Sequence, residues 1–203
     1  MTAESAEAPV EERARRIIES TIELAEEGGF EAVRLRDVAA RAEVALGTLY
    51  RRFRSKEELL VAALEQETRG METRVRQRPP KGATAAERAI GFFVLATRGM
   101  LRRPHLSRAM LRCAAAGEPA LARKVGLFHD MMRGMIVAAM RGDSVAEDGA
   151  PMSERERLRG DVLNHVWFAL MVGWSGGLET QATIHDQMRA TVELVLGDAT
   201  DGA

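Results

Sequence analysis

The sequence of 203 residues carries a nearly balanced charge, with 29 Lys and Arg against 30 Asp and Glu. A chain of this length can bury a hydrophobic core in one large domain or two small ones. Because the net charge is -1, the composition does not indicate a nucleic-acid partner, and any basic surface must be local.

The sequence contains one cysteine, Cys113, which cannot form a disulfide within the chain. No charged segment followed by an apolar one opens the sequence, so we expect a reducing, cytoplasmic setting. Residues 162–178 carry no charge, but a membrane span needs about 20 apolar residues. This stretch includes Asn164, His165 and three glycines, so it predicts a buried helix and no membrane contact.

The first third of the chain predicts an N-terminal arm followed by four helices. Residues 1–10 mix Glu with Ala, Ser and Pro, a composition typical of a disordered arm. From Glu11, apolar residues recur at helical spacing until Gly28 and Gly29 end the first helix. Two short helices are expected at 35–42 and 45–53, with a tight turn at residues 43–44. Ser55 and Glu58 form a capping-box pattern that opens a helix reaching about residue 75.

The rest of the chain predicts only further helices. Pro79, Pro80 and Gly82 end the fourth helix. A second capping-box pattern, Ser153 with Glu156, opens one of the later helices. No stretch alternates with period two, so a sheet has little support and the expected fold is all-α. The later helices are expected at 85–101, 105–116, 119–141, 153–173 and 184–196.

Basic residues cluster around the second and third predicted helices. Between residues 34 and 56 there are seven basic side chains and two acidic ones, a local net of plus five. A solvated helix face is the usual explanation of such a run. Here the charge coincides with a short helix, a tight turn and a second short helix, the geometry that places a recognition helix in the major groove. The basic residues are Arg34, Arg36, Arg41, Arg51, Arg52, Arg54 and Lys56.

Leu46, Gly47 and Thr48 stand at the N-terminal end of the predicted recognition helix, which covers residues 46–52. Gly costs about 1 kcal/mol relative to Ala inside a helix, so helix propensity does not explain Gly47. A close approach of this helix to DNA would explain it.

Two segments of this region resemble the DNA-binding domain of TetR-type repressors. They read GFEAVRLRDVA at residues 29–39 and VALGTLYRRFRSKEELL at residues 44–60. The match covers about a quarter of the chain, with apolar, Gly, aromatic and Lys positions in register. The resemblance implies a helix-turn-helix domain, expected at residues 11–56. It also implies a helical ligand-binding and dimerisation domain, expected at residues 57–203.

The resemblance also implies roles for individual residues. Tyr50 and Lys56 would each contact a phosphate, Arg36 would reach a base edge, and Leu46 and Thr48 would face the groove. The alternative for Tyr50 is a core aromatic. The residues expected to contact DNA are Arg34, Arg36, Ala45, Leu46, Gly47, Thr48, Tyr50, Arg51, Arg52 and Lys56.

Four positions depart from the pattern of the family. Arg34 and Ala45 stand where Thr and Ser are common, and Glu43 and Arg54 stand where Gly and Pro are common. Loss of a capping Ser or Thr costs about 0.5–2 kcal/mol, so these helix starts must depend on packing. Arg34 and Arg54 would add phosphate contacts instead.

The C-terminal two thirds is rich in Met and aromatic residues, which suit a flexible apolar pocket for a small effector. The alternative is that these side chains simply fill a core. The residues expected to line the pocket are Phe92, Phe93, Met100, Met110, Phe128, Met131, Met132, Met135, Trp167, Phe168, Met171 and Trp174.

The last two predicted helices are expected to form a four-helix interface in a homodimer. Two copies would place their recognition helices in successive major grooves of a palindromic operator. The expected interface residues are Trp167, Leu170, Val192, Val195 and Leu196.

Shorter segments are similar to actinobacterial repressors of sterol catabolism, including ALGTLYR at residues 45–51, the pair Val166 and Trp167, and LVLGD at residues 194–198. This similarity implies a sterol-derived acid or its coenzyme A thioester as effector. Arg98, Arg102 and Arg103 could meet such an anion, although a solvated helix end explains them more simply.

The sequence does not indicate an enzyme or a cofactor. Its four histidines have no metal-ligand spacing, and Asp161 with His165 at i, i+4 could pair but lacks a nucleophile. Cys113 lies in an apolar segment and is expected to be inert. The function expected is therefore a ligand-responsive repressor. The alternatives are an architectural DNA-binding protein without a ligand and a small helical enzyme.

Overall fold

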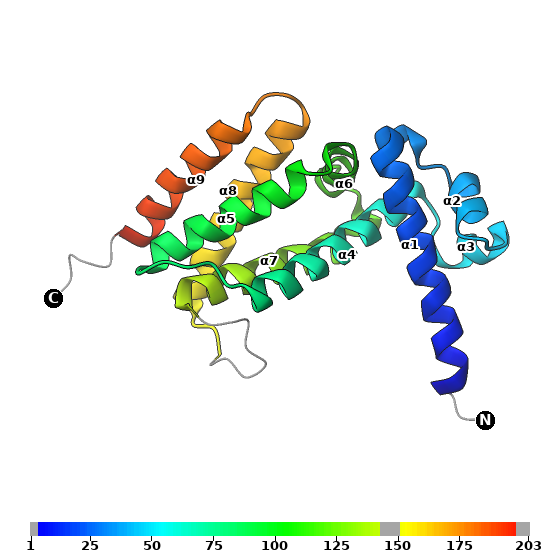
Figure 1. The fold of residues 1–203 in the computed structure, drawn as a ribbon, viewed down its shortest axis with the longest axis horizontal. Helices are drawn as coiled ribbons and strands as arrows, with labels where there is room; N and C mark the ends of the chain where they lie inside the picture. The colour runs from blue at the N-terminus through cyan, green and yellow to red at the C-terminus, as the bar shows by residue number, and fades with distance from the viewer. Residues whose placement is uncertain (1–3, 143–150, 198–203) are drawn as a thin grey trace. The chain divides into compact units, whose positions relative to one another are not determined.

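A computed structural model describes residues 4–142 and 151–197, with side chains from Glu11 onward, and these residues form helices and no strand. The all-α prediction is confirmed. The helices, shown in Figure 1, are α1 (Glu4–Ala32), α2 (Leu35–Arg41), α3 (Leu46–Arg52), α4 (Lys56–Gln77), α5 (Ala85–Leu101), α6 (Pro104–Ala115), α7 (Ala122–Arg141), α8 (Glu154–Ser175) and α9 (Gln181–Leu196), with a 3₁₀ turn at Pro119–Leu121.

The chain divides into two compact units. The first unit contains Met1–Gln66 and Arg103–Lys124, and the second contains Glu67–Arg102 and Val125–Ala203. The first unit therefore combines the N-terminal helices with α6, although α6 follows them by many residues. Each unit has its own buried residues.

The first helix begins earlier than expected. Residues 4–10, expected to belong to a disordered arm, have helical backbone, and residues 1–3 lie outside the described residues. Glu and Ala are good helix formers, and Glu is favoured near a helix N-terminus, so this segment can extend the helix that follows. The expected break at the glycine pair is present, because Gly28 and Gly29 are non-helical and Gly29 has a φ of +67° that favours glycine.

The helix starts follow the capping signals, with three differences. Ser153 and Glu156 form the expected capping box. Ser55 accepts a bond from the Glu58 N–H at 3.2 Å, but the Glu58 carboxylate accepts from the Arg54 N–H instead of completing the box. A full capping box at Thr84 and an N-cap at Thr180 were not predicted. In each case a threonine directly precedes the helix, so the sequence did contain the signal.

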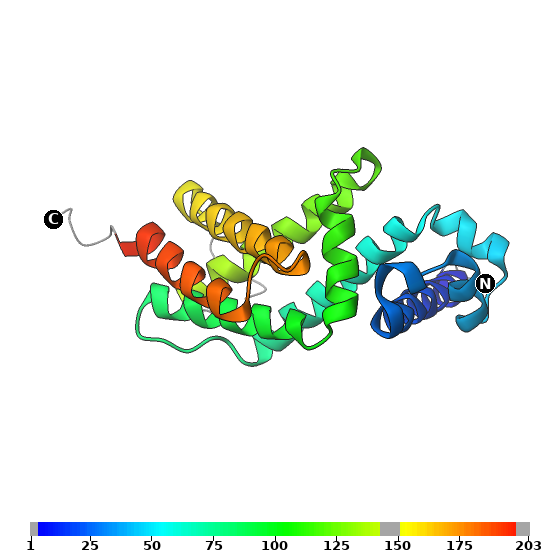
Figure 2. The ribbon, with the colours of Figure 1, turned by 90° about the horizontal axis from the view of Figure 1, so that it is seen from above.

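The first unit is held by α1, which packs against α2 and α6, while α2 packs against α3 (Figures 1 and 2). Ile17 of α1, Val38 of α2 and Leu49 of α3 are almost fully buried. Val33, between α1 and α2, is also fully buried. These side chains form the apolar floor beneath α2 and α3.

The second unit is held by α5, α8 and α9, with α9 packed against both of the other helices (Figure 1). The Trp167 indole N–H donates to Thr97 Oγ1 at 3.0 Å, which satisfies a buried donor of α8 from α5. Arg88 of α5 donates to the carbonyls of Ala139 and Met140, the last-turn acceptors of α7. No helix among the described residues is long and apolar enough to cross a membrane.

The turn between α2 and α3 places Glu43 in a backbone conformation that is unfavourable for any residue other than glycine. Glu43 has a φ of +53°, the left-handed region in which a non-glycine residue costs about 1–2 kcal/mol. Its N–H donates to the Ala40 carbonyl, and the Val44 N–H donates to the Ala39 carbonyl. These two bonds define a Schellman motif with Glu43 at the position where glycine is preferred.

We therefore expect Glu43→Gly to raise the free energy of unfolding by about 1 kcal/mol, because it removes the left-handed penalty. Urea unfolding at a fixed protein concentration measures the change. Glu43→Ala is the control, since it also removes the carboxylate but keeps the unfavourable φ. Equal stabilisation by both variants would contradict the explanation.

Candidate DNA-binding site

The candidate site is built from α2, the turn at residues 42–45 and α3. Val38 and Ala39 of α2 and Leu49 of α3 are buried, and Phe53 closes the end of α3 at 4% exposed. The N-cap residues Arg34 and Ala45 make no side-chain capping bond, as expected. Packing beneath the two helices therefore fixes their position.

None of the ten residues expected to contact DNA is buried in this chain. Tyr50 is 52% exposed, while Leu49 and Phe53 occupy the apolar positions, so the core-aromatic alternative for Tyr50 is wrong. The half-buried members of the set are Leu46, Thr48 and Lys56, and the exposed members are Arg34, Arg36, Ala45, Gly47, Tyr50, Arg51 and Arg52.

Gly47 lies on the open side of α3. A β-carbon built at this position would meet no atom within 4 Å. The fold of this chain therefore does not require glycine at position 47, and the helix propensity of α3 would improve with alanine.

The basic cluster is divided between structure and surface. Arg41 donates two bonds to the Glu27 carboxylate of α1, at 2.7 and 3.1 Å, and these bonds lower the pKa of Glu27. Arg51 donates to Thr48 Oγ1 at 3.0 Å, which fixes its guanidinium along the surface of α3. Arg41 thus holds α2 to α1, while Arg51 stays on the exposed face.

Lys56 begins α4 and is held by groups that the sequence did not indicate. Its Nζ lies 3.7 Å from the centroid of the Phe30 ring and 3.5 Å from Glu31 Oε2. Arg112 of α6 contacts the same ring and the same carboxylate. No local pattern could have revealed this cluster, because Arg112 is far from Phe30 in the sequence.

The residues expected to line an effector pocket fall in both units. Met110 belongs to the first unit, with α6, and the other eleven belong to the second. Nine of the twelve are buried, and Met100, Met131 and Phe168 are half-buried. In the second unit, Phe93 lies 5.3 Å from Phe92 and 6.3 Å from Trp167, measured between ring centroids. Burial alone fits the core alternative, so their role in binding stays a prediction.

A polar pair lies among these apolar side chains of the second unit. The amide Nδ2 of Asn164 is 2.8 Å from His129 Nδ1, and Asn164 is fully buried. Its Oδ1 has no hydrogen-bond partner within residues 4–142 and 151–197. Burial, and secondarily the nearby His165, lower the pKa of His129, which favours the neutral imidazole over the charged one. Asn164 therefore presents a buried acceptor that no group among the described residues fills.

Two residues that the sequence grouped with others, Asp161 and Arg103, have different partners in the structure. Asp161 accepts a bond from Arg133 at 2.8 Å, so this carboxylate is engaged by Arg133 and not by the histidine one turn along. Arg103 forms an ion pair with Glu26 inside the first unit, whereas Arg98 and Arg102 belong to the second.

Three of the five expected dimer-interface residues need correction, whereas Val195 and Leu196 of α9 are half-buried and stay predicted. Trp167, Leu170 and Val192 are buried within the chain, because they face the interior that α5, α8 and α9 enclose. The exposed large apolar residues of α8 and α9 are Leu158, Val162 and Leu194, at 63%, 38% and 77% exposed.

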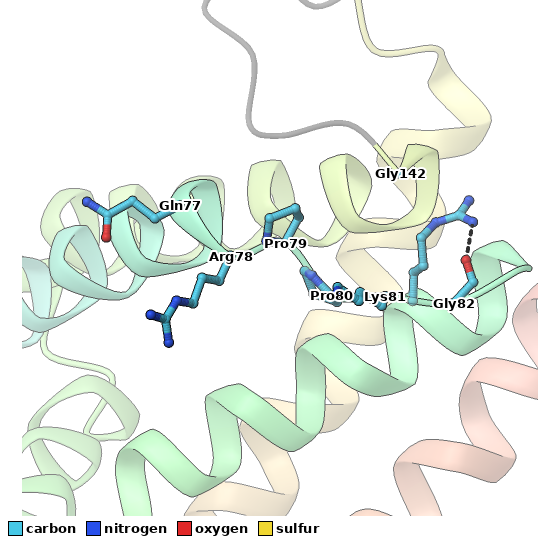
Figure 3. A pocket seen from close by; sticks show the side chains of 8 residues that line it. Gln77, Arg78, Pro79, Pro80, Lys81, Gly82 and Gly142 are labelled. Atoms are coloured by element: carbon cyan, nitrogen blue, oxygen red, sulfur yellow. Dashed lines mark hydrogen bonds between the residues drawn. The ribbon is translucent and has the colours of Figure 1, made fainter.

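The remaining candidate sites are the thiol of Cys113, a possible metal site and an open pocket. Cys113 is buried, and burial raises the pKa of its thiol to about 12, so the thiol stays protonated and inert. No group of three potential metal ligands occurs in the part of the chain that the structure describes. An open pocket of about 720 Å³ lies beside the loop between α4 and α5, where Arg88 donates to the Gly82 carbonyl (Figure 3). It contains none of the residues expected to bind an effector.

Comparison with known families gives matches along most of the chain. Residues 17–63 match the bacterial regulatory proteins of the tetR family. Residues 82–195 match the tetracyclin repressor-like C-terminal domain. The first match contains α2 and α3, and the second contains α5 to α8.

Curated relatives and solved structures agree with these matches. The chain is 35% identical to the HTH-type transcriptional repressor KstR of Rhodococcus jostii, over 93% of this chain and 85% of the relative. It is 32% identical to KstR of Mycobacterium tuberculosis, over 92% and 82%. A TetR transcriptional regulator from Rhodococcus sp. RHA1 superimposes with a TM-score of 0.79 at 29% identity, covering 94% of this chain and 98% of that one.

A second solved structure shares the fold at lower identity. FadR of Thermus thermophilus, a TetR-family repressor in complex with lauroyl-CoA, gives a TM-score of 0.70 at 21% identity, covering 93% of this chain and 96% of that one. The curated relatives are transcriptional repressors and not enzymes, and the resemblance expected from the sequence is confirmed. This chain belongs to the TetR family of bacterial regulatory proteins.

Proposed function

We propose that this protein is a ligand-responsive transcriptional repressor that binds a palindromic operator as a homodimer. The observation that carries the proposal is the exposed basic surface around α3 on a chain whose net charge is -1. Each phosphate that such a surface neutralises releases condensed counterions, which favours binding to DNA. In a bacterial cell this function belongs in the cytoplasm, with the chromosome.

Within this surface the proposed roles follow exposure and chemistry. The Tyr50 hydroxyl donates a hydrogen bond to a phosphate oxygen, and Lys56 contacts a second phosphate from the start of α4. Arg36, Leu46 and Thr48 face the base edges, where Arg is suited to guanine. Positioning and sequence selection thus belong to different residues.

The proposed dimer uses the exposed apolar faces of α8 and α9. Leu158 and Val162 are one turn apart on α8, and Leu194 lies on α9. Burial of these side chains against their copies would form a four-helix interface with two-fold symmetry. Two copies of α3 about 34–36 Å apart would then match a palindrome.

The proposed effector is apolar or lipid-like and binds the second unit. The Met-rich interior supports this assignment, because Met adapts to irregular apolar ligands. The KstR relatives and the lauroyl-CoA complex of a protein with the same fold support a sterol-derived acid or its coenzyme A thioester. The unfilled acceptor of Asn164 would receive a hydroxyl or amide N–H of the effector.

The proposed effector acts by preferring one conformer. A ligand that binds better to a form whose recognition helices are misspaced lowers DNA affinity by that difference. A coupling of about 1–3 kcal/mol is enough for a five-fold to 150-fold response.

The first test separates positioning from sequence selection. Tyr50→Phe and Lys56→Ala should weaken binding to every duplex alike, and Lys56→Ala should reduce the salt slope by about 0.9 per phosphate lost. Thr48→Ala should change the preferred sequence. Selection of bound sequences from a random pool, with fluorescence-anisotropy titrations, measures both effects. Arg123→Ala, which removes an exposed arginine of α7 outside the proposed site, is the control. Unchanged DNA binding in all three site variants would contradict the proposal.

Gly47→Ala should move stability and DNA affinity in opposite directions. The fold has room for the methyl group, so the helix gains up to about 1 kcal/mol of stability. The methyl group would obstruct close approach to DNA, and we expect binding about tenfold weaker, equivalent to 1.4 kcal/mol. Gly99→Ala on α5, which also has open space, should stabilise without changing DNA binding. Normal DNA affinity in Gly47→Ala would exclude the close approach.

Effector release can be tested with a sterol-derived acid, its coenzyme A thioester, lauroyl-CoA and free coenzyme A. We expect the sterol thioester to displace the protein from DNA, and Asn164→Leu to weaken that response about fivefold through loss of one hydrogen bond of about 1 kcal/mol. DNA affinity without ligand should stay unchanged. A protein that binds DNA but responds to no ligand would instead be an architectural DNA-binding protein.

A further inference from the structure

Two cations from different helices lie over one aromatic ring in the first unit. Lys56 Nζ, at the start of α4, is 3.7 Å from the Phe30 ring centroid. Arg112 Cζ, on α6, is 3.8 Å from the same centroid. We call Phe30, Glu31, Lys56 and Arg112 the Phe30 cluster. It connects the end of α1, the start of α4 and α6.

The two cations also share one carboxylate. Glu31 Oε2 lies 3.5 Å from Lys56 Nζ, and Glu31 Oε1 accepts a bond from Arg112 Nη1 at 3.3 Å. The Glu31 side chain is 76% exposed, so it can exchange partners with solvent ions. The Lys56 side chain is only 26% exposed, which limits the directions from which a phosphate can reach it.

The ring and the carboxylate have different effects on Lys56. The Phe30 ring attracts the ammonium group but leaves its N–H donors available to an anion. The Glu31 carboxylate accepts from the same ammonium group that a phosphate would contact, and its negative charge repels that phosphate. Two like charges about 4 Å apart in water repel by about 1 kcal/mol, so phosphate binding at Lys56 requires Glu31 to move away or be shared.

We propose that Glu31 competes with DNA phosphate for Lys56, and that Arg112 of α6 weakens this competition by sharing the Glu31 carboxylate. Arg112 is then a positioning residue that sets DNA affinity from a helix outside the helix-turn-helix. The inference depends on the proposed function, because it assumes that Lys56 contacts DNA.

The test is a set of single and double substitutions, with duplex DNA of mixed sequence at low salt as the probe, since phosphate contacts dominate there. Glu31→Gln should tighten binding about threefold, within the range expected of an exposed ion pair. In a Lys56→Ala background, Glu31→Gln should tighten DNA binding only as much as the loss of any one negative charge from the surface does. Glu19→Gln, on α1 and paired with Arg15, measures that general effect.

The contribution of Arg112 is tested in the same assay. Arg112→Ala should weaken binding about twofold, because Glu31 then pairs with Lys56 alone. In a Glu31→Gln background, Arg112→Ala should have no more effect than Arg123→Ala, which removes an exposed arginine of the first unit. Urea unfolding of each variant separates these effects from a loss of folded protein.

Two results would overturn the inference. Glu31→Gln could tighten binding equally with and without Lys56, or no more than Glu19→Gln does; either result removes the competition. If Arg112→Ala weakened DNA binding as much in the Glu31→Gln background as in the unsubstituted protein, Arg112 would not act through Glu31. Failure of the proposed function looks different, because the unsubstituted protein would then show no salt-dependent binding to any duplex.

Discussion

The apolar floor beneath α2 and α3 is the constraint on which the DNA-binding surface depends. Each helix has seven residues and lacks a side-chain N-cap, and helices of this length do not persist alone in water. Burial of Val38 and Leu49 against the first unit supplies the stability that the caps would otherwise give. A change in this packing would displace every side chain on the exposed face of α3.

The same constraint explains how a nearly neutral chain presents a basic surface. Arg41 is bonded to Glu27 and so holds α2 in place, while Arg36, Arg51 and Arg52 remain exposed. The useful charge is therefore set by the pairing of each cation and not by the count of basic residues. Lys56 is intermediate between the paired Arg41 and the exposed arginines, because the Phe30 cluster both positions its ammonium group and supplies a competing carboxylate.

Features with a local cause were predictable from the sequence. Helical spacing predicted the all-α fold, the Gly28 and Gly29 pair predicted the break in α1, and Ser153 predicted the start of α8. The exposure of Tyr50 followed from the apolar character of its neighbours at positions 49 and 53. Each of these depends on residues within a few positions of one another.

Features that depend on distant residues were not predictable in this way. The contact between Arg112 and Phe30, and the pairing of Asn164 with His129, join segments that only the tertiary fold brings together. The apolar pattern of α8 and α9 could not separate Trp167 and Val192, which face the interior, from Leu158 and Leu194, which face outward. Both sets have helical spacing, and the choice between them depends on where α5 packs.

The most direct test of the central claim is the salt dependence of DNA binding by the unsubstituted protein. If the exposed cations around α3 contact phosphates, the logarithm of the association constant should fall linearly with the logarithm of salt concentration. The expected slope is about -0.9 for each phosphate neutralised, and several contacts per subunit would give a steep line. Binding that is absent, or that does not change with salt, would contradict the account.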